Sequence, residues 1–175
     1  MRKVILGVAV TLDGFIEGLN GEYDWCLTDQ DYGMSEFLDR IDSIFLGRKS
    51  YELVLEVEKK DPAAHNPFRE HKHYVFSNSL RSVSDGMILI SGDVKTKVNE
   101  IKSKAGKDIW LFGGASLTTY FINEGLLDEM WLAIHPILLG SGKKLFSDIN
   151  RQIKLSLLDS KTYSTGLISM TYALD

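Results

Sequence analysis

Two glycine-terminated apolar runs form the pattern in this sequence that points most clearly to chemistry. Gly113-Gly114 follows the apolar residues 109–112, and Gly47 follows residues 44–46. A helical pattern begins directly after each of them. Unpaired backbone N–H groups at the start of a helix attract anions, and glycine lets a ligand lie against bare backbone. The two junctions therefore predict phosphate binding, although a tight turn with a positive φ would also select glycine.

The side chains after Gly47 strengthen this prediction. Arg48, Lys49 and Ser50 supply two cations and a hydroxyl group at the start of the second helix. The G-x-G-x-x-G fingerprint is absent, and the residues around Gly142 do not meet the spacing of a P-loop. The predicted phosphate site therefore belongs to neither of these two common motifs.

Metal binding and nucleophilic catalysis have little support in the sequence. His71 and His73 lie two residues apart on a predicted strand and so face the same way, but no third ligand accompanies them, and we expect no metal site. Cys26 is the single cysteine and cannot form an internal disulfide, which fits a reducing compartment. We do not expect it to act as a nucleophile.

Three other side chains are candidates for contact with a substrate. Trp25 and Tyr32 lie in a polar loop that could roof a binding site, and His135 ends a predicted strand just before Pro136. The alternative role is core packing for Trp25 and Tyr32. For His135 the alternative is a structural role in the turn.

The elements that must position these residues alternate along the chain. Apolar runs predict strands at residues 3–10, 44–46, 73–76, 87–90, 109–112 and 129–135, and two C-terminal strands at 154–158 and 167–174. Helical spacing connects Met34, Phe37, Leu38 and Ile41, and further helices open at residues 48–52, 94 and 115. The polar residues 56–70, with two prolines, predict a surface loop.

This order of elements predicts an α/β fold, a three-layer αβα sandwich around a mostly parallel mixed sheet. The last two strands have no room for a crossover helix between them and should pair antiparallel. With 175 residues, of which 44% are hydrophobic and 25% charged, we expect one domain over residues 1–175.

The composition also argues against two classes of partner. The net charge is −4 with acidic and basic residues interleaved, so we expect no binding of nucleic acid. No apolar run reaches the ~18 residues that a membrane span needs, and the N-terminal strand does not resemble a signal peptide. We expect a cytoplasmic protein without a membrane partner.

Five stretches, in order along the chain, resemble the dihydrofolate reductase superfamily. The branch they resemble includes the C-terminal reductase domain of the bacterial riboflavin-biosynthesis deaminase-reductase. The stretches are T-L-D-G-F-I at 11–16, F-L-G-R-K-S-Y-E at 45–52, V-F-S-N-S at 75–79, L-F-G-G-A-S-L at 111–117 and L-L-D-E-M-W-L-A-I-H-P-I-L-L-G-S-G-K-K-L-F at 126–146. The last is the most specific to this branch.

The resemblance implies a dihydrofolate reductase-like fold that binds NADPH across the carboxyl ends of the strands. It places the backbone of Val8 and Ala9 at the nicotinamide amide, and Asp13-Gly14 in the loop that closes over the ring. The segment Gly47, Arg48, Lys49 and Ser50 would hold phosphates. Ser77 and Asn78 would reach the adenosine 2′-phosphate together with Arg48. The pyrophosphate would lie on Gly113, Gly114, Ala115, Ser116 and Leu117.

The resemblance also suggests a catalytic carboxylate. In dihydrofolate reductases an acidic group on the helix before the G-R-K-S-like motif bonds the pterin ring, and an ungapped count places Asp31 there. Asp29 is the alternative. The competing role is that Asp31 caps the helix through Met34 and Phe37.

The expected activity is reduction of a small heterocyclic substrate, either pterin-like or resembling 5-amino-6-(5-phosphoribosylamino)uracil, by hydride transfer from NADPH. The chain lacks the long Arg-containing segment of the riboflavin-pathway enzymes and the zinc motifs of their deaminase, so the substrate stays open. The alternative is a protein that binds NADP(H) without turnover. Related reductase domains form homodimers, and the apolar Leu132, Ile134, Ile137 and Leu138 lead us to expect a homodimer here.

Overall fold

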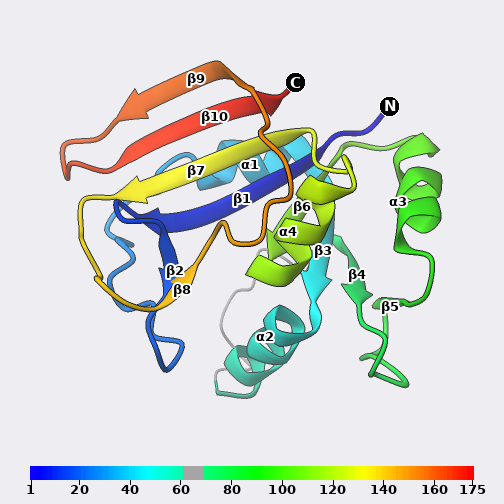
Figure 1. The fold of residues 1–175 in the computed structure, drawn as a ribbon. Coiled ribbons are helices and arrows are strands. Elements are labelled where there is room, and N and C mark those ends of the chain that lie inside the picture. The colour runs from blue at the N-terminus through cyan, green and yellow to red at the C-terminus, as the bar shows by residue number, and fades with distance from the viewer. Residues whose placement is uncertain (61–68) are drawn as a thin grey trace.

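The computed structural model describes residues 1–60 and 69–175, which build a mixed sheet of eight strands in the order β5-β4-β3-β6-β1-β7-β10-β9 (Figure 1). The pairs from β5 to β7 are parallel, and β7, β10 and β9 pair antiparallel, as the sequence predicts. The strands are β1 (Val4–Thr11), β3 (Ile41–Gly47), β4 (Lys72–Phe76), β5 (Ile88–Ile90), β6 (Asp108–Gly113), β7 (Glu129–His135), β9 (Leu155–Thr162) and β10 (Ile168–Leu174).

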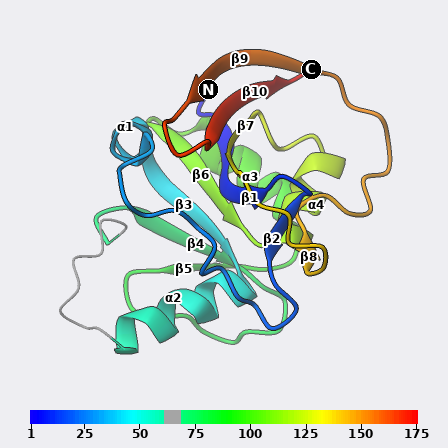
Figure 2. The same cartoon turned by 90° about the vertical axis from the view of Figure 1, so that its left-hand side faces the viewer.

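Helices cover both faces of the sheet and make the predicted three layers (Figure 2). On one face α3 (Val94–Ser103) and α4 (Ala115–Asn123) pack against a core centred on Phe45 and Phe121, both completely buried. On the other face α1 (Met34–Arg40) and α2 (Arg48–Lys60) enclose a second core with Ile5 and Trp110. The faces alternate along β1 because successive strand residues point to opposite sides.

A second, two-stranded sheet lies outside the main one. β2 (Phe15–Glu17) pairs antiparallel with β8 (Lys143–Lys144), which joins the loop after β1 to the loop after β7. An ion pair of 3.2 Å between Lys143 and Glu17 reinforces this ribbon. Gly142 is required there, because a Cβ on it would lie 2.2 Å from the carbonyl oxygen of Glu17.

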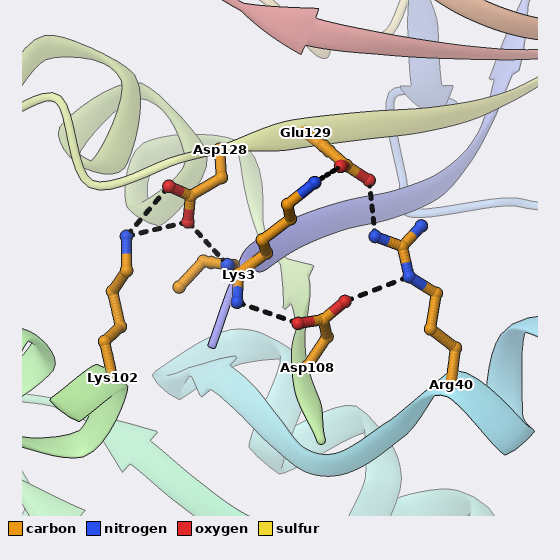
Figure 3. Close-up of polar contacts among 7 residues, drawn as sticks. Lys3, Arg40, Lys102, Asp108, Asp128 and Glu129 are labelled. Carbon is orange, nitrogen blue, oxygen red and sulfur yellow. Dashed lines mark hydrogen bonds and ion pairs between the residues drawn. The ribbon is translucent and has the colours of Figure 1, made fainter. Parts of the chain in front are cut away.

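The amino ends of the central strands are held together by an ion network, shown in Figure 3. Glu129, whose side chain is 3% exposed, accepts from Lys3 at 2.5 Å and from Arg40 at 2.7 Å. Arg40 also binds Asp108 at 3.0 Å, and Asp128 pairs with Lys102 at 2.7 Å. The network links β1, β6, β7, α1 and α3 at the edge of the sheet opposite to Gly47 and Gly113.

Three predicted boundaries were wrong. One is the end of β9, which runs to Thr162 and not only to residue 158. Ile41 fits the helical spacing of α1 but begins β3, because Ser43 is drawn into the sheet as a buried residue that accepts from Arg2 at 2.8 Å. The helix that opens at Arg48 continues to Lys60, so residues 56–60 are helical although they were predicted as loop. The rest of that predicted loop, up to residue 68, lies outside the described residues.

Candidate functional site

A cleft with a volume of about 460 Å³ lies at the carboxyl ends of β3, β4 and β6. It brings together three segments that the sequence assigned to cofactor binding, although they are far apart in the chain. Its lining consists of Gly47, Arg48, Lys49, Phe76, Ser77, Asn78, Ile90, Gly92, Val94, Gly114, Ala115, Ser116, Leu117, Tyr120 and Lys143. Parallel strands deliver their carboxyl ends to one edge of a sheet, which is why these segments meet.

The two glycine junctions lie directly beside each other in this cleft. β3 and β6 are neighbours, and a Cβ on Gly47 would lie 3.2 Å from the carbonyl oxygen of Gly113 and 3.6 Å from Cβ of Leu117. Gly113 has a φ of 109°, which a larger side chain rarely adopts, and its peptide bond to Gly114 is cis. Two helix starts, those of α2 and α4, therefore open onto one cleft with bare backbone between them.

Cationic and polar side chains line the cleft at the start of α2 and after the end of β4. Arg48 is half-exposed and pairs with Glu52 one turn along α2, at 2.9 Å. The hydroxyl of Ser77 accepts from the N–H groups of residues 79 and 80, so it shapes the turn after β4. Asn78 accepts from the Gly92 N–H at 3.0 Å through its carbonyl oxygen, which leaves its amide donors for another group.

Ser50, predicted with these residues, is buried behind the cleft instead of lining it. Its hydroxyl lies 3.7 Å from the position that a Cβ on Gly114 would take. Thr118, in the first turn of α4, was not singled out from the sequence. It is 1% exposed, its hydroxyl has no partner among the described residues, and it lies 3.7 Å from the corresponding Cβ position on Gly113. A buried hydroxyl without a partner beside the glycine pair is consistent with a bound ligand that would supply the missing hydrogen bond to Thr118.

The sheet opens next to the other predicted cofactor residues. β1 pairs with β6 only as far as Leu6, but with β7 as far as Thr11, so β1 and β6 separate beside Val8 and Ala9. Both residues are half-buried. Because of this separation, the backbone of Val8 and Ala9 is not paired with β6, and it lies toward the same carboxyl end of the sheet as the cleft.

Asp13 joins two loops. Its carboxylate accepts from the Thr11 hydroxyl at 2.6 Å, from the Gly140 N–H at 2.7 Å and from the Leu139 N–H at 3.2 Å. The hydrogen bond from the Thr11 hydroxyl is the largest cause that holds the pKa of Asp13 below its usual value. Burial opposes it, and the N–H groups of Gly140 and Leu139 lower the pKa further. Gly14, with a φ of 87°, makes the turn between Asp13 and β2. The two residues therefore fix the loop that was predicted to close over a bound ring.

Asp31 is exposed and lies at the start of α1. Its carboxylate accepts from the Gly33 N–H at 3.1 Å, from the Ser35 N–H at 3.0 Å and from the Ser35 hydroxyl at 2.7 Å. The Ser35 hydrogen bonds lower its pKa. This geometry favours the capping role, and catalysis by Asp31 stays a prediction. The alternative, Asp29, accepts from the Tyr32 hydroxyl at 2.5 Å.

The three predicted substrate residues take part in two separate contacts, one around Tyr32 and one between Trp25 and His135. Tyr32 is buried, packs edge-on against Tyr163 and donates from its hydroxyl to Asp29, which ties the loop before α1 to the β9–β10 turn. Trp25 and His135 contact each other edge to face, with ring centroids 5.2 Å apart. His135 is 3% exposed, and its burial lowers its pKa. Hydrogen bonds to the carbonyl groups of residues 133 and 10 raise the pKa and so oppose this effect.

The cleft contains residues that sequence reasoning did not select. Gly92 and Tyr120 carry weak signals of their own, a glycine after a short strand and an aromatic residue on α4. Lys143 was considered only for a P-loop and, together with Lys144, for a basic surface, and neither interpretation pointed to this cleft. It lines the cleft through the β2–β8 ribbon, a pairing that no local pattern announces.

Three further features bear on metal binding, thiol chemistry and membrane insertion in the described part of the chain. Residues 1–60 and 69–175 contain no group of three potential metal ligands. Burial, with a contribution from Asp24, raises the pKa of the Cys26 thiol to about 11, so it is protonated at neutral pH. Within the same residues, no helix is both long and apolar enough to cross a membrane.

Known proteins resemble this chain, one in sequence and two in fold. The uncharacterized protein YyaP of Bacillus subtilis (strain 168) is 45% identical over 177 residues, covering 98% of this chain and 94% of that protein. A putative riboflavin biosynthesis protein from Shewanella sp. PV-4 has a TM-score of 0.86 at 24% identity, with 99% of each chain covered. The dihydrofolate reductase of Enterococcus faecalis, solved in complex with NADP(H), has a TM-score of 0.71 at 14% identity over 99% of this chain and 96% of that one.

These likenesses confirm the dihydrofolate reductase-like fold that the five sequence stretches implied. The sequence profile described as RibD C-terminal domain matches residues 2–169, nearly the whole chain. The protein therefore belongs to the RibD C-terminal domain family.

Proposed function

We propose that the protein is an NADPH-dependent reductase of a small heterocyclic substrate. The observation that carries this proposal is the cleft at the carboxyl ends of β3, β4 and β6, where three predicted cofactor segments converge. The dihydrofolate reductase of Enterococcus faecalis, which has the same fold, was solved with NADP(H). When bound, such a cofactor supplies a hydride to the substrate.

The residues of the cleft fit the parts of a dinucleotide. The backbone at Gly114, Ala115 and Ser116 and the start of α2 at Arg48 would hold the diphosphate, where the helix N-termini favour negative charge. Arg48, Ser77 and Asn78 would meet a 2′-phosphate. Val8 and Ala9, at the separation of β1 and β6, would face the nicotinamide end.

The substrate would lie beyond that end, near Trp25, Tyr32 and His135. Its class is a pterin-like heterocycle or one related to 5-amino-6-(5-phosphoribosylamino)uracil, and the branch of the family favours the second. Asp31 would act on it only if the start of α1 released its carboxylate.

The proposal is tested by adding NADPH and then either dihydrofolate or 5-amino-6-(5-phosphoribosylamino)uracil, while the absorbance of NADPH is followed. Substrate-dependent oxidation is the expected result. Binding of NADPH without oxidation by either compound would favour the alternative, a nucleotide-binding protein without turnover. Failure to bind NADPH at all would overturn both.

Two properties complete the proposal. A homodimer is proposed because apolar side chains remain exposed, among them Leu138 at 71% and Leu157 at 56%. A cytoplasmic location is proposed because the single cysteine suits a reducing compartment.

A further inference from the structure

Two buried polar atoms at the carboxyl end of β7 lack hydrogen-bond partners and belong to side chains in contact. They are Nε1 of Trp25 and Nε2 of His135, whose rings meet edge to face at 5.2 Å. Buried polar groups are nearly always paired, so two orphans at one place need an explanation.

The hydrogen bonding of each ring defines the role of its orphaned atom. Nδ1 of His135 lies 3.0 Å from the carbonyl oxygen of Ala133. A carbonyl can only accept, so Nδ1 carries the proton and, in the neutral imidazole, Nε2 is an acceptor. The indole Nε1–H of Trp25 can only donate. The two rings in contact therefore carry one unpaired donor and one unpaired acceptor.

The position of the pair relates it to the proposed active site. His135 ends β7 and is in register with Thr11, two residues beyond Ala9 on β1. Trp25 covers it from a segment with few ties: in the described part of the chain, no hydrogen bond joins residues 24–28 to another element. A small shift of that segment that parts the two rings would expose both nitrogen atoms to a ligand between them, without breaking a backbone hydrogen bond to the sheet.

We propose that Trp25 Nε1–H and His135 Nε2 together bind an amide-type edge of a ligand, in which an N–H stands next to a C=O. This inference rests on the proposed function, because that function supplies two sources of such an edge. One is the lactam of a heterocyclic substrate, and the other is the carboxamide of a nicotinamide ring. The ligand N–H donates to His135, and the ligand carbonyl accepts from Trp25.

The test uses matched pairs of small probes on the intact protein. Uracil carries the edge, and 1,3-dimethyluracil keeps its carbonyls but has no N–H. Nicotinamide carries the edge, and 3-acetylpyridine keeps the carbonyl alone. The readout is the indole N–H resonance of Trp25, one of three tryptophans in the chain. The other two indoles already donate, Trp110 to the Gly7 carbonyl at 2.9 Å and Trp131 to the Ser169 hydroxyl at 2.7 Å.

We expect uracil or nicotinamide, but not its matched analogue, to shift the Trp25 resonance and the Nε2 signal of His135. The responding probe identifies the source. Trp25→Phe and His135→Leu should each weaken binding of that probe about five-fold or more, the loss of one buried hydrogen bond. His135→Gln, which retains an acceptor, should restore part of it. Trp131→Phe is the matched control and should change nothing.

Three results would overturn the inference. The first is that neither uracil nor nicotinamide shifts the signals at millimolar concentration while NADPH still binds. The second is that the analogues bind as well as their parents. The third is that a long-lived water is found between the two rings. Each of these leaves the reductase proposal standing. Failure of the wild-type protein to bind NADPH or to oxidise it with any substrate counts against the reductase proposal alone.

Discussion

Arg48 lies at the start of α2 on the lining of the cleft, and in the proposed function its guanidinium meets the 2′-phosphate of NADPH. We expect Arg48→Ala to weaken NADPH binding about ten-fold or more, because a charge-assisted hydrogen bond to a phosphate contributes roughly 1.5–3 kcal/mol. NADH, which lacks the 2′-phosphate, should bind nearly unchanged. Fluorescence titration with both cofactors measures this.

Arg151→Ala is the matched control for Arg48→Ala, because that arginine lines a separate pocket with residues 173–175. It should leave both affinities unchanged. Equal losses of NADPH and NADH in Arg48→Ala would show that Arg48 acts through Glu52 and the stability of α2 instead of through the phosphate.

Variants of Asp31 can distinguish a capping role of this side chain from a catalytic one. All three of its hydrogen bonds go to the start of α1, so we expect Asp31→Ala to cost about 1 kcal/mol of unfolding free energy. Asp31→Asn should keep most of that stability, since asparagine caps well. Melting temperature and NADPH oxidation are measured on both variants.

The same pair of variants decides the catalytic role. If Asp31 only caps, Asp31→Asn retains turnover. A sharp drop in turnover with unchanged melting temperature would restore Asp31 as the acidic group that contacts the substrate, because an amide cannot relay a proton.

At the scale of elements, the ionised carboxylate of Asp13 is one of the ties between the loop after β1 and the loop after β7, beside the β2–β8 pairing. Its folded pKa lies below the ordinary 3.8, so the stabilisation is complete above that value and is lost as the pH falls through the lower folded pKa. We expect the amides of Leu139 and Gly140 to lose protection from hydrogen exchange in this acidic range. Asp13→Asn should lose it already at neutral pH, and unchanged protection there would refute the role of the charge.

The ion network at the amino ends gives a prediction on stability alone. Arg40→Met leaves the buried Glu129 with only Lys3, whereas Glu129→Gln leaves two cations that reach solvent. We therefore expect Arg40→Met to be the more destabilising, by about 3 kcal/mol, the lower end for breaking a buried ion pair. Urea unfolding measures it. NADPH affinity should not change, because the network and the cleft lie at opposite edges of the sheet.

The elements show where sequence reasoning succeeds and where it stops. β7 was predicted at its observed bounds, because its apolar run ends at a residue before proline. Residues 56–60 were misjudged because polarity was taken as a sign of loop, although Glu and Lys are good helix formers and the helix ends just before Pro62. Ile41 was misassigned because a long-range partner, Arg2, draws the next residues into the sheet.

The residues of the candidate site also fall into those that the sequence could predict and those that it could not. Gly47 and Gly114 could be found because a glycine between a strand and a helix is a local signal. The contact of Trp25 with His135 and the approach of Lys143 to the cleft depend on which strands become neighbours. That information is distributed over the whole sheet and is not contained in any one segment.

At the scale of the molecule, a homodimer of the 19.7 kDa chain stays a prediction. Leu132, one of the residues chosen for the interface, is 8% exposed and belongs to the core, whereas Leu155, Leu157 and Leu158 on the edge strand β9 are exposed. Sedimentation at micromolar concentration should give twice the chain mass. Leu157→Lys should shift the protein toward the monomer, and a wild-type monomer at that concentration would refute the prediction.

The place of β1 in the sheet also determines when the protein can fold during its synthesis. Val4 pairs with Ile109 and Ile5 with Glu129, so β1 leaves the ribosome more than a hundred residues before its partners in the sheet. At roughly 5–20 residues per second, this apolar strand waits for about 5–20 s. During that time it can pair with another nascent chain. The yield of folded protein should therefore depend on the chaperones that bind emerging chains.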